Sequence, residues 1–219
     1  MNLDKKSFAN AKHILIITDN GAFANASALY SYVLTLHKKV SIHKTGDIER
    51  KFSFLAWFDK LRAETPSYAD FIIEVSSDIK SLFNFFIVNE IKINKKMATA
   101  LYGALLIRYE SFMSEECDAG VFAMASELIH LGAEYKLCND KITHSLSLAH
   151  FRLKAIMLQS MLLTENASCA NLYITDNDLK ASGATLNDAV HVMKECLHLV
   201  HIKCVILYKN QIKERKIEK

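Results

Sequence analysis

Residues 13–43 read HILIITDNGAFANASALYSYVLTLHKKVSIH, and this stretch decides the fold class. It begins with HILIIT (His13–Thr18), a continuous apolar run rich in β-branched residues, which is typical of a strand covered on both faces in a parallel sheet. Apolar residues then recur at helical spacing over residues 25–38, and VSIH (residues 40–43) favours a second strand. A strand, a helix and a strand within about thirty residues predict a right-handed βαβ unit.

The same periodicity predicts elements along the rest of the chain. An amphipathic helix is expected over residues 51–63, a third strand over 70–75 and a helix over 77–88, capped by Ser76 or Ser77. Beyond residue 93 the pattern is mainly helical. Helices are predicted over 95–109, capped by Asn94, over 118–131, ended by Gly132, and over 145–163. A short helix capped by Asp176 or Asn177 is expected to stop near Gly183, and another helix is expected over 186–199. Strands are predicted over 169–175 and 203–208.

Composition limits the class of protein. The chain has 219 residues, 51% of them hydrophobic, with six Gly and one Pro, which excludes wholesale disorder and a turn-rich all-β fold. The prediction is an α/β protein in which an N-terminal parallel-sheet lobe with helices spans residues 1–135. A linker helix and a shorter second α/β lobe are expected over residues 136–219.

Charge and cysteine content point to a cytoplasmic protein. The net charge of +3 is too small to indicate binding to an extended nucleic acid, and the basic stretch KNQIKERKIEK (residues 209–219) is expected to be a solvated tail. The five cysteines form no C-x-x-C pair, which indicates reduced thiols. Neither a signal peptide nor an apolar run of membrane-spanning length is found, so no membrane association is expected.

The turn after the first predicted strand holds most of the candidate ligand-binding residues, because ligands bind at the carboxyl ends of strands in such sheets. These candidates are Asp19, Asn20, Asn25 and Ser27. Asp19 could bind a metal or a polar ligand near the start of the helix. The alternative is that Asp19 and Asn20 stabilise the turn and cap the helix. The stretch contains neither a dinucleotide-binding fingerprint nor a P-loop.

Arg108 is the fifth candidate, because it follows the apolar run ALLI and a cation there needs a partner or an anion. It is expected either to bind phosphate or to pair with Glu110, Glu115 or Glu116. No residue is predicted to be catalytic, since the chain has no G-x-S-x-G elbow.

Nine histidines prompt a search for metal ligands. His198, His201 and Cys204 have the spacing of one helix face, but the strand expected near Cys204 would break that face. His144 and His150 show no ligand spacing. No metal site is predicted from these residues.

The order of these segments resembles the DHH phosphoesterase family, especially the short bacterial members that cleave oligoribonucleotides and 3′-phosphoadenosine 5′-phosphate. The resemblance covers most of the chain. It rests on the opening segment ILIITDNGAFANASALYSYVLTLHKKVSIH, on ADFIIEVSS with the helices after it, on SFMSEECDAGVFAMASELIHLGAEYKLCNDKI, and on SLSLAHFRLKAIMLQSMLL with ITDNDLKASGAT. It implies a DHH-like N-terminal lobe, a helical linker and a truncated second lobe.

The resemblance also implies two manganese ions held by several Asp and His side chains. At the matching positions this chain has Gly21 and Phe23 in place of the two Asp of the first motif, Ser76 near the inner-strand Asp, and Arg108 in place of a later Asp. No adjacent His pair is present, and the late Gly-rich, His-containing substrate loop has no counterpart. The resemblance therefore implies a catalytically degenerate relative with no metal cofactor.

Three functions remain open on this basis. The first is a regulatory or adaptor protein that binds a protein partner or forms a homodimer. The second is a nucleotide- or phosphate-binding protein that uses the five candidate residues. The third is residual manganese-dependent phosphodiesterase activity on short oligonucleotides.

Overall fold

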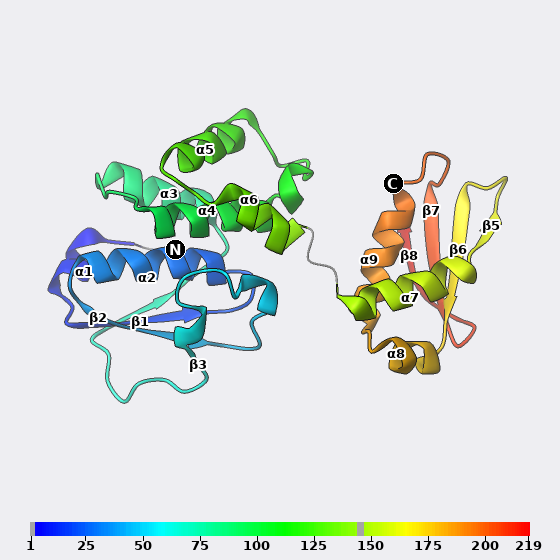
Figure 1. Ribbon diagram of the computed structural model, residues 1–219, viewed down its shortest axis with the longest axis horizontal. Coiled ribbons are helices and arrows are strands. Elements are labelled where there is room, and N and C mark those ends of the chain that lie inside the picture. Colours follow the sequence, from blue (N-terminus) through cyan, green and yellow to red (C-terminus); the bar gives the residue numbers. More distant parts are fainter. Residues whose placement is uncertain (1–2, 144–146) are drawn as a thin grey trace. The chain divides into compact units, whose positions relative to one another are not determined.

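The computed structural model describes residues 3–143 and 147–219 (Figure 1). The chain divides into two compact units, Met1–Ser145 and Leu146–Lys219. The two units together form a mixed α/β fold, as the sequence predicts, because each unit builds its own sheet and its own helical layer.

Unit 1 is built on a four-stranded parallel sheet with the strand order β3-β2-β1-β4. Its strands are β1 (His13–Thr18), β2 (Lys39–Lys44), β3 (Leu61–Arg62) and β4 (Phe71–Glu74). In the centre of the sheet, Ile16 of β1 lies opposite Ile42 of β2 and Ile73 of β4. The HILIIT strand is therefore central and mostly buried, which confirms the prediction of a parallel sheet around it.

Helices of unit 1 pack in layers on this sheet (Figure 1). Helix α2 contacts β1 and β2 on one side and α4 on the other, and it is buried almost all round. The helices and turns are α1 (Lys5–Asn10), α2 (Phe23–Thr35), α3 (Ile79–Val88), α4 (Lys95–Arg108), α5 (Ala119–His130) and α6 (Tyr135–Cys138), with η1 (Arg50–Phe52), η2 (Phe58–Lys60), η3 (Glu110–Phe112) and the π-helical turn η4 (Asn139–Thr143).

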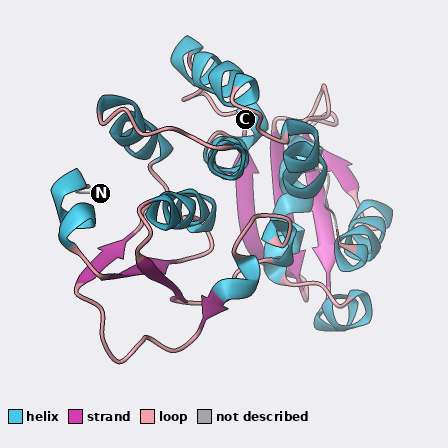
Figure 2. Cartoon of the chain, turned by 60° about the vertical axis from the view of Figure 1, so that its left-hand side comes forward, coloured by secondary structure: helices cyan, strands magenta, loops and turns pink. Residues whose placement is uncertain are grey.

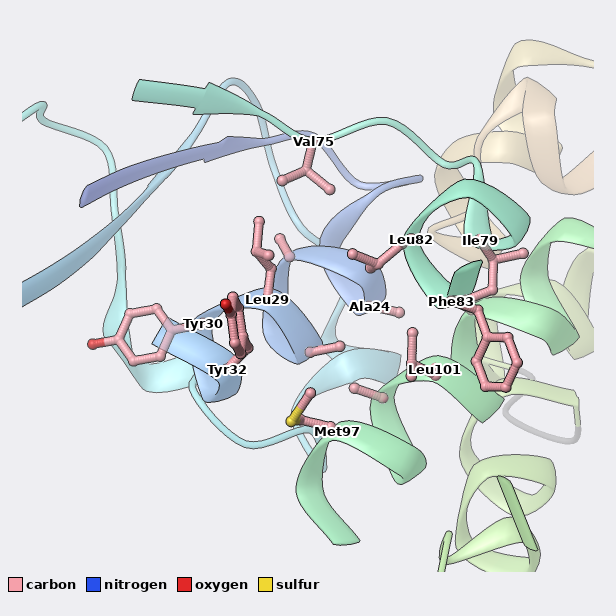
Figure 3. Close-up of a cluster of buried hydrophobic side chains, with 14 of the residues drawn as sticks. Ala24, Leu29, Tyr30, Tyr32, Val75, Ile79, Leu82, Phe83, Met97 and Leu101 are labelled. Carbon is pink, nitrogen blue, oxygen red and sulfur yellow. The ribbon is translucent and has the colours of Figure 1, made fainter. Parts of the chain in front are cut away.

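The core of unit 1 lies between α2, α3, α4 and the sheet. Figure 3 shows Leu29 and Tyr32 of α2 beside Leu82 of α3 and Met97 and Leu101 of α4. All five side chains are almost completely buried. This core fixes the start of α2, and with it the turn that follows β1.

The boundary between the units lies later in the chain than the expected one at residue 135. Helix α6 and turn η4 follow that position, and both pack against α4. The Cys138 thiol donates a hydrogen bond to the carbonyl of Thr99 at 3.4 Å, and the backbone N–H of Glu134 donates to the Thr99 hydroxyl at 3.1 Å. These contacts attach the segment to unit 1.

The helix predicted over residues 51–63 is wrong. The structure has η1, η2 and the short strand β3 in its place. Trp57 adopts a φ of 81°, which is incompatible with a helix, and its ring packs on Tyr30 at a centroid distance of 5.0 Å. The Trp57 indole also donates to the Ser31 hydroxyl at 2.8 Å. Tertiary contacts with α2 therefore override the local helical periodicity.

Unit 2 has a mixed sheet with the order β5-β6-β7-β8, in which only β6 and β7 are parallel to each other. Its core contains Leu153 and Met157 of α7, Val192 of α9 and the inward side chains Leu172 and Val205. The elements are α7 (Leu148–Gln159), β5 (Leu162–Thr164), β6 (Cys169–Ile174), α8 (Asp176–Ser182), α9 (Leu186–Leu197), β7 (Cys204–Lys209) and β8 (Ile212–Glu218).

Two predictions for unit 2 are wrong. The helix expected over 145–163 ends at Gln159, because the Ser160 hydroxyl forms hydrogen bonds with the backbone of Tyr173 and the chain then turns into β5. The expected start of this helix, residues 145 and 146, lies outside the described residues. The expected solvated tail 209–219 is mostly strand β8, antiparallel to β7. Asn210 and Gln211 both have positive φ, as the tight turn of a β-hairpin requires.

Helix caps follow the predictions in part. Asn94 caps α4 and Asp118 caps α5, each through a side-chain hydrogen bond to a backbone N–H, and Gly132 follows α5 with a φ of 90°. Asp78, rather than Ser76 or Ser77, caps α3.

Thr175 is the cap of α8, so the prediction of Asp176 or Asn177 is wrong. Thr175 forms a capping box with Asp178, which satisfies two backbone N–H groups at once.

The five cysteines are all free, as expected from their spacing. Within the described ranges, no helix is both long and apolar enough to cross a membrane.

Candidate functional site

The candidate site of unit 1 lies where β1, β2 and β4 end. These strands are parallel, so their carboxyl ends share one edge of the sheet, where ligands bind in folds of this kind. The turn from β1 into α2 contains Asp19 and Asn20, and the first turns of α2 contain Asn25 and Ser27. The position of each side chain decides whether it is available to a ligand.

Asp19 stabilises the turn before α2. Its Oδ1 accepts a hydrogen bond from the backbone N–H of Ala22 at 2.9 Å, and the Thr18 hydroxyl donates to the Asp19 carbonyl at 3.1 Å. Ala22, the N-cap residue just before α2, forms no side-chain capping hydrogen bond. Asp19 therefore has the turn-stabilising role that was the alternative to metal binding.

Asn20 links the turn after β1 to the loop after β2. Its Nδ2 donates to Glu49 Oε1 at 2.6 Å, and its Oδ1 accepts from the backbone N–H of Glu49 at 2.9 Å. Lys51 forms an ion pair with the same carboxylate at 2.9 Å. Both polar atoms of the Asn20 amide are thus used within the protein.

Asn25 and Ser27 are structural links of α2. Both are almost completely buried. Asn25 Nδ2 donates to the carbonyl of Ser76 at 2.9 Å, and the Ser27 hydroxyl donates to the carbonyl of Ala56 at 2.7 Å. Among the described residues, Asn25 Oδ1 has no hydrogen-bond partner. These side chains hold the segments after β4 and before η2 against α2.

Arg108 lies at the end of α4 and pairs with Glu116, one of the three acidic partners that were expected. Its guanidinium also lies 5.5 Å from the centroid of the Tyr109 ring. A second ion pair, Lys80 to Asp118 at 3.1 Å, lies in the same region. The hydrogen bond that Lys80 donates to Asp118 raises the pKa of Lys80. Hydrogen bonds from the Val121 backbone and from Lys80 lower the pKa of Asp118.

A small cavity of about 350 Å³ adjoins Arg108. Its charged lining consists of two cations, Lys80 and Arg108, and two carboxylates, Asp78 and Glu116; Ser77, Ile79 and Tyr109 complete the lining. Asn25 reaches the neighbouring residue Ser76. The structure therefore brings Asn25 and Arg108 to the same segment after β4, whereas Asn20 is held by Glu49 and Asp19 by the backbone of Ala22.

The described residues do not fit a two-metal centre. No group of three or more His, Cys, Asp or Glu side chains in residues 3–143 and 147–219 is arranged to hold a metal ion. His198 ends α9 and Cys204 begins β7, so their shared helix face is broken, as the sequence indicated. His150 instead contacts Glu195 at 3.1 Å; His144 lies outside the described residues.

Sequence reasoning missed two residues of this region, Glu49 and Lys80. Each contacts a partner far away in the sequence: Glu49 contacts Asn20, and Lys80 contacts Asp118. No spacing or motif marks such contacts, because they depend on the packing of loops. Ser76 was identified from the sequence as a possible helix cap and as the position of a missing Asp, but not as the partner of Asn25.

Comparison with family models finds no match for this chain, and comparison with curated proteins finds none either. Among solved structures, the chain is similar to an exopolyphosphatase-related protein from Bacteroides fragilis, with a TM-score of 0.75 and 12% sequence identity over 95% of this chain and 79% of that chain. It is also similar to a candidate family II inorganic pyrophosphatase from Methanococcus jannaschii, with a TM-score of 0.42 and 12% identity over 90% of this chain and 83% of that chain.

The similarity to the Bacteroides fragilis protein establishes the fold. The chain has a mixed α/β fold with two compact units, each with its own sheet, and this fold is similar to that of the exopolyphosphatase-related protein. At 12% identity the similarity extends to the fold alone, and the activity has to be argued from the site.

Proposed function

We propose that this protein is a catalytically degenerate DHH-like phosphoesterase that acts as an interaction or regulatory module. The observation that carries the proposal is the use of the candidate site by the fold itself. Asp19 and Asn20 stabilise the β1–α2 turn, Asn25 and Ser27 bind backbone carbonyls, and Arg108 is paired with Glu116. None of these side chains has the arrangement that two-metal hydrolysis needs.

The chemistry at the expected metal positions supports the proposal. Gly21 and Phe23 replace two carboxylates, and a buried phenyl ring such as that of Phe23 cannot ligate a cation. Arg108 adds a positive charge where the resemblance implies a carboxylate, and it would oppose metal binding.

Exposed apolar side chains on α7 support the interaction role. Leu148, Phe151 and Leu158 are 65%, 54% and 41% exposed, and their spacing places them on one side of the helix. Exposed groups of large apolar side chains mark protein–protein contact sites more often than an average surface does. We propose a protein partner or a second copy of this chain as the occupant.

Hydrolysis assays test the proposal. The full chain is incubated with short oligoribonucleotides and with 3′-phosphoadenosine 5′-phosphate in the presence of Mn²⁺, and products are followed by chromatography. No hydrolysis above the buffer control is expected. Turnover at ordinary enzymatic rates, on the order of 1 s⁻¹ or faster, would establish the phosphodiesterase alternative instead.

The cavity beside Arg108 favours a second candidate function, the binding of a nucleotide or phosphate without hydrolysis. Lys80 and Arg108 provide two cations there, although each is paired with a carboxylate, which an incoming anion would have to displace. Calorimetry with a panel of nucleotides tests this function. Binding by the wild type that is lost in Arg108→Ala would support it, and no binding by the wild type would exclude it.

A further inference from the structure

A larger cavity lies at the other end of the sheet of unit 1, at the amino ends of β1 and β2. Its volume is about 630 Å³. Strand residues His13, Lys39 and Ser41 line one side, and residues 62–66 line the other. Residues 63–70 form the long loop between β3 and β4, which contains no helix or strand (Figure 2). The candidate site described above begins only after Thr18, so this cavity is separate from it.

The loop over this cavity is held at both ends. Before it, Arg62 of β3 pairs with His43 of β2 in the parallel sheet. After it, the Asp70 carboxylate accepts hydrogen bonds from the backbone N–H groups of Lys12 at 2.8 Å and His13 at 2.7 Å. These two hydrogen bonds lower the pKa of Asp70, so its carboxylate stays charged at neutral pH. These contacts fix both ends of the loop beside the strands that line the cavity.

Two cations of the cavity have no carboxylate partner within the part of the chain that the structure describes. No carboxylate of the described residues forms an ion pair with Lys39 or Arg62, whereas Arg108 and Lys80 at the opposite edge are both paired. Glu64 supplies one carboxylate to the lining, so cations outnumber anions there. An anionic ligand would supply the missing charge.

A buried polar wall adds hydrogen-bond donors. His13 is 5% exposed, and its Nε2 lies 2.9 Å from the Ser41 hydroxyl oxygen. When Nε2 carries the proton and donates it to Ser41, the hydroxyl proton of Ser41 is free to bond a ligand. Thr65 provides a second hydroxyl. The lining is rich in donors, which suits a ligand rich in acceptors.

We propose that this cavity binds an organic phosphate monoester. A phosphate group offers several acceptor oxygens on one centre, which matches the donors of Lys39, Arg62 and Ser41. The volume is in the range of small-molecule sites and exceeds that of a phosphate ion alone, so it leaves room for a sugar or nucleoside group. The proposal does not depend on the function proposed for the carboxyl edge of the sheet.

Calorimetry with AMP, ribose 5-phosphate and adenosine tests this proposal. The two phosphate esters are expected to bind the wild-type chain, and adenosine, which lacks the phosphate, is expected not to bind. Arg62→Gln is expected to weaken AMP binding by about tenfold or more, because it removes a charge-assisted hydrogen bond. Lys60→Gln is the matched control: it removes one positive charge two residues away, outside the lining, and is expected to leave the affinity unchanged.

Several outcomes would overturn the proposal: no binding of either phosphate ester by the wild type, equal binding of adenosine, or equal losses in Arg62→Gln and Lys60→Gln. Lys39→Gln repeats the test should Arg62→Gln fail to fold by circular dichroism. Arg108→Gln separates the two edges of the sheet. Binding that survives Arg62→Gln and is lost in Arg108→Gln would assign the ligand to the cavity beside α4 and reject this one.

Nuclear magnetic resonance gives an independent readout. On addition of AMP, the backbone amide signals of His13, Ser41 and Thr65 are expected to shift, while those of Asp19 and Asn20 stay in place. Shifts confined to the turn after β1 would contradict the proposal.

Discussion

Asn20 and Glu49 hold each other through two hydrogen bonds, one from the Asn20 amide to the Glu49 carboxylate and one from the Glu49 backbone to Asn20 Oδ1. The pair joins the turn after β1 to the loop after β2. These two segments lie at the edge of the sheet formed by the carboxyl ends of β1 and β2. Asn20, for which the sequence left a structural and a ligand-binding role open, therefore links two loops of the protein.

Replacing Asn20 with Ala is expected to lower the free energy of unfolding of unit 1 by about 1–2 kcal/mol, because both hydrogen bonds are lost at a partly exposed site. Urea denaturation followed by fluorescence of Trp57 measures the change. Asn84→Ala, at an exposed position of α3, is the control and is expected to change stability by less than about 0.5 kcal/mol. Equal effects of both variants would show that the Asn20–Glu49 pair contributes nothing specific.

Manganese is expected to leave the thermal unfolding of the chain unchanged. An ion that binds only the native state raises the melting temperature, by an amount set by its concentration relative to its dissociation constant. Differential scanning calorimetry with 1 mM Mn²⁺, compared with 1 mM EDTA, measures the effect. A rise of several degrees with Mn²⁺ would contradict the metal-free assignment, whatever the activity assays show.

Phe151→Glu is expected to weaken self-association by about tenfold or more, if a second copy of this chain covers α7, since it puts a charge into an apolar contact. Sedimentation velocity over a range of concentrations measures the change. Phe122 on α5 is similarly exposed, at 55%, so Phe122→Glu is a matched control and is expected to behave as the wild type. A wild-type chain that stays monomeric throughout would reject the homodimer and leave a different protein as the partner.

Unit 2 is expected to lose stability as the pH falls below about 4.5, through Glu195. Burial alone would raise the pKa of Glu195, but hydrogen bonds from Lys154 and His150 outweigh burial and leave the pKa below the ordinary value of 4.5. A carboxyl whose pKa is lowered by folding stabilises the folded state above its unfolded pKa, and this contribution disappears as the pH falls through the folded pKa.

Glu195→Gln tests that expectation. The variant is expected to be less stable by about 1–2 kcal/mol at pH 7 and to lose less stability than the wild type between pH 5 and pH 3. Urea denaturation at several pH values, followed by circular dichroism, gives both quantities. Glu165→Gln in the exposed loop before β6 is the control. The same acid sensitivity in wild type and Glu195→Gln would assign the pH dependence to other groups.

The fold was largely predictable because its main signals are local. The run His13–Thr18 is continuous and β-branched, so it indicates a buried parallel strand wherever it occurs. Asn94 and Asp118 cap their helices through hydrogen bonds to backbone N–H groups only three positions further along the chain. By contrast, the segment around Trp57 follows contacts with α2, which no local pattern records.

The candidate site was less predictable for a related reason. Residue types identified Asp19, Asn20 and Arg108 as polar groups at a sheet edge or helix end, and the structure places them there. Whether such a group is free for a ligand depends on partners far along the chain, as Glu49 is for Asn20. The sequence alone therefore left the structural and the ligand-binding interpretations both open.

Strand β8 changes the meaning of the basic segment at residues 209–219. It lies at an edge of the second sheet, where unpaired backbone groups could recruit a strand from another molecule. Four consecutive charged residues, Lys213 to Lys216, follow one another along that edge. Adding a further strand would desolvate these charges, so the segment acts as a barrier to aggregation and keeps the sheet at its four-strand width.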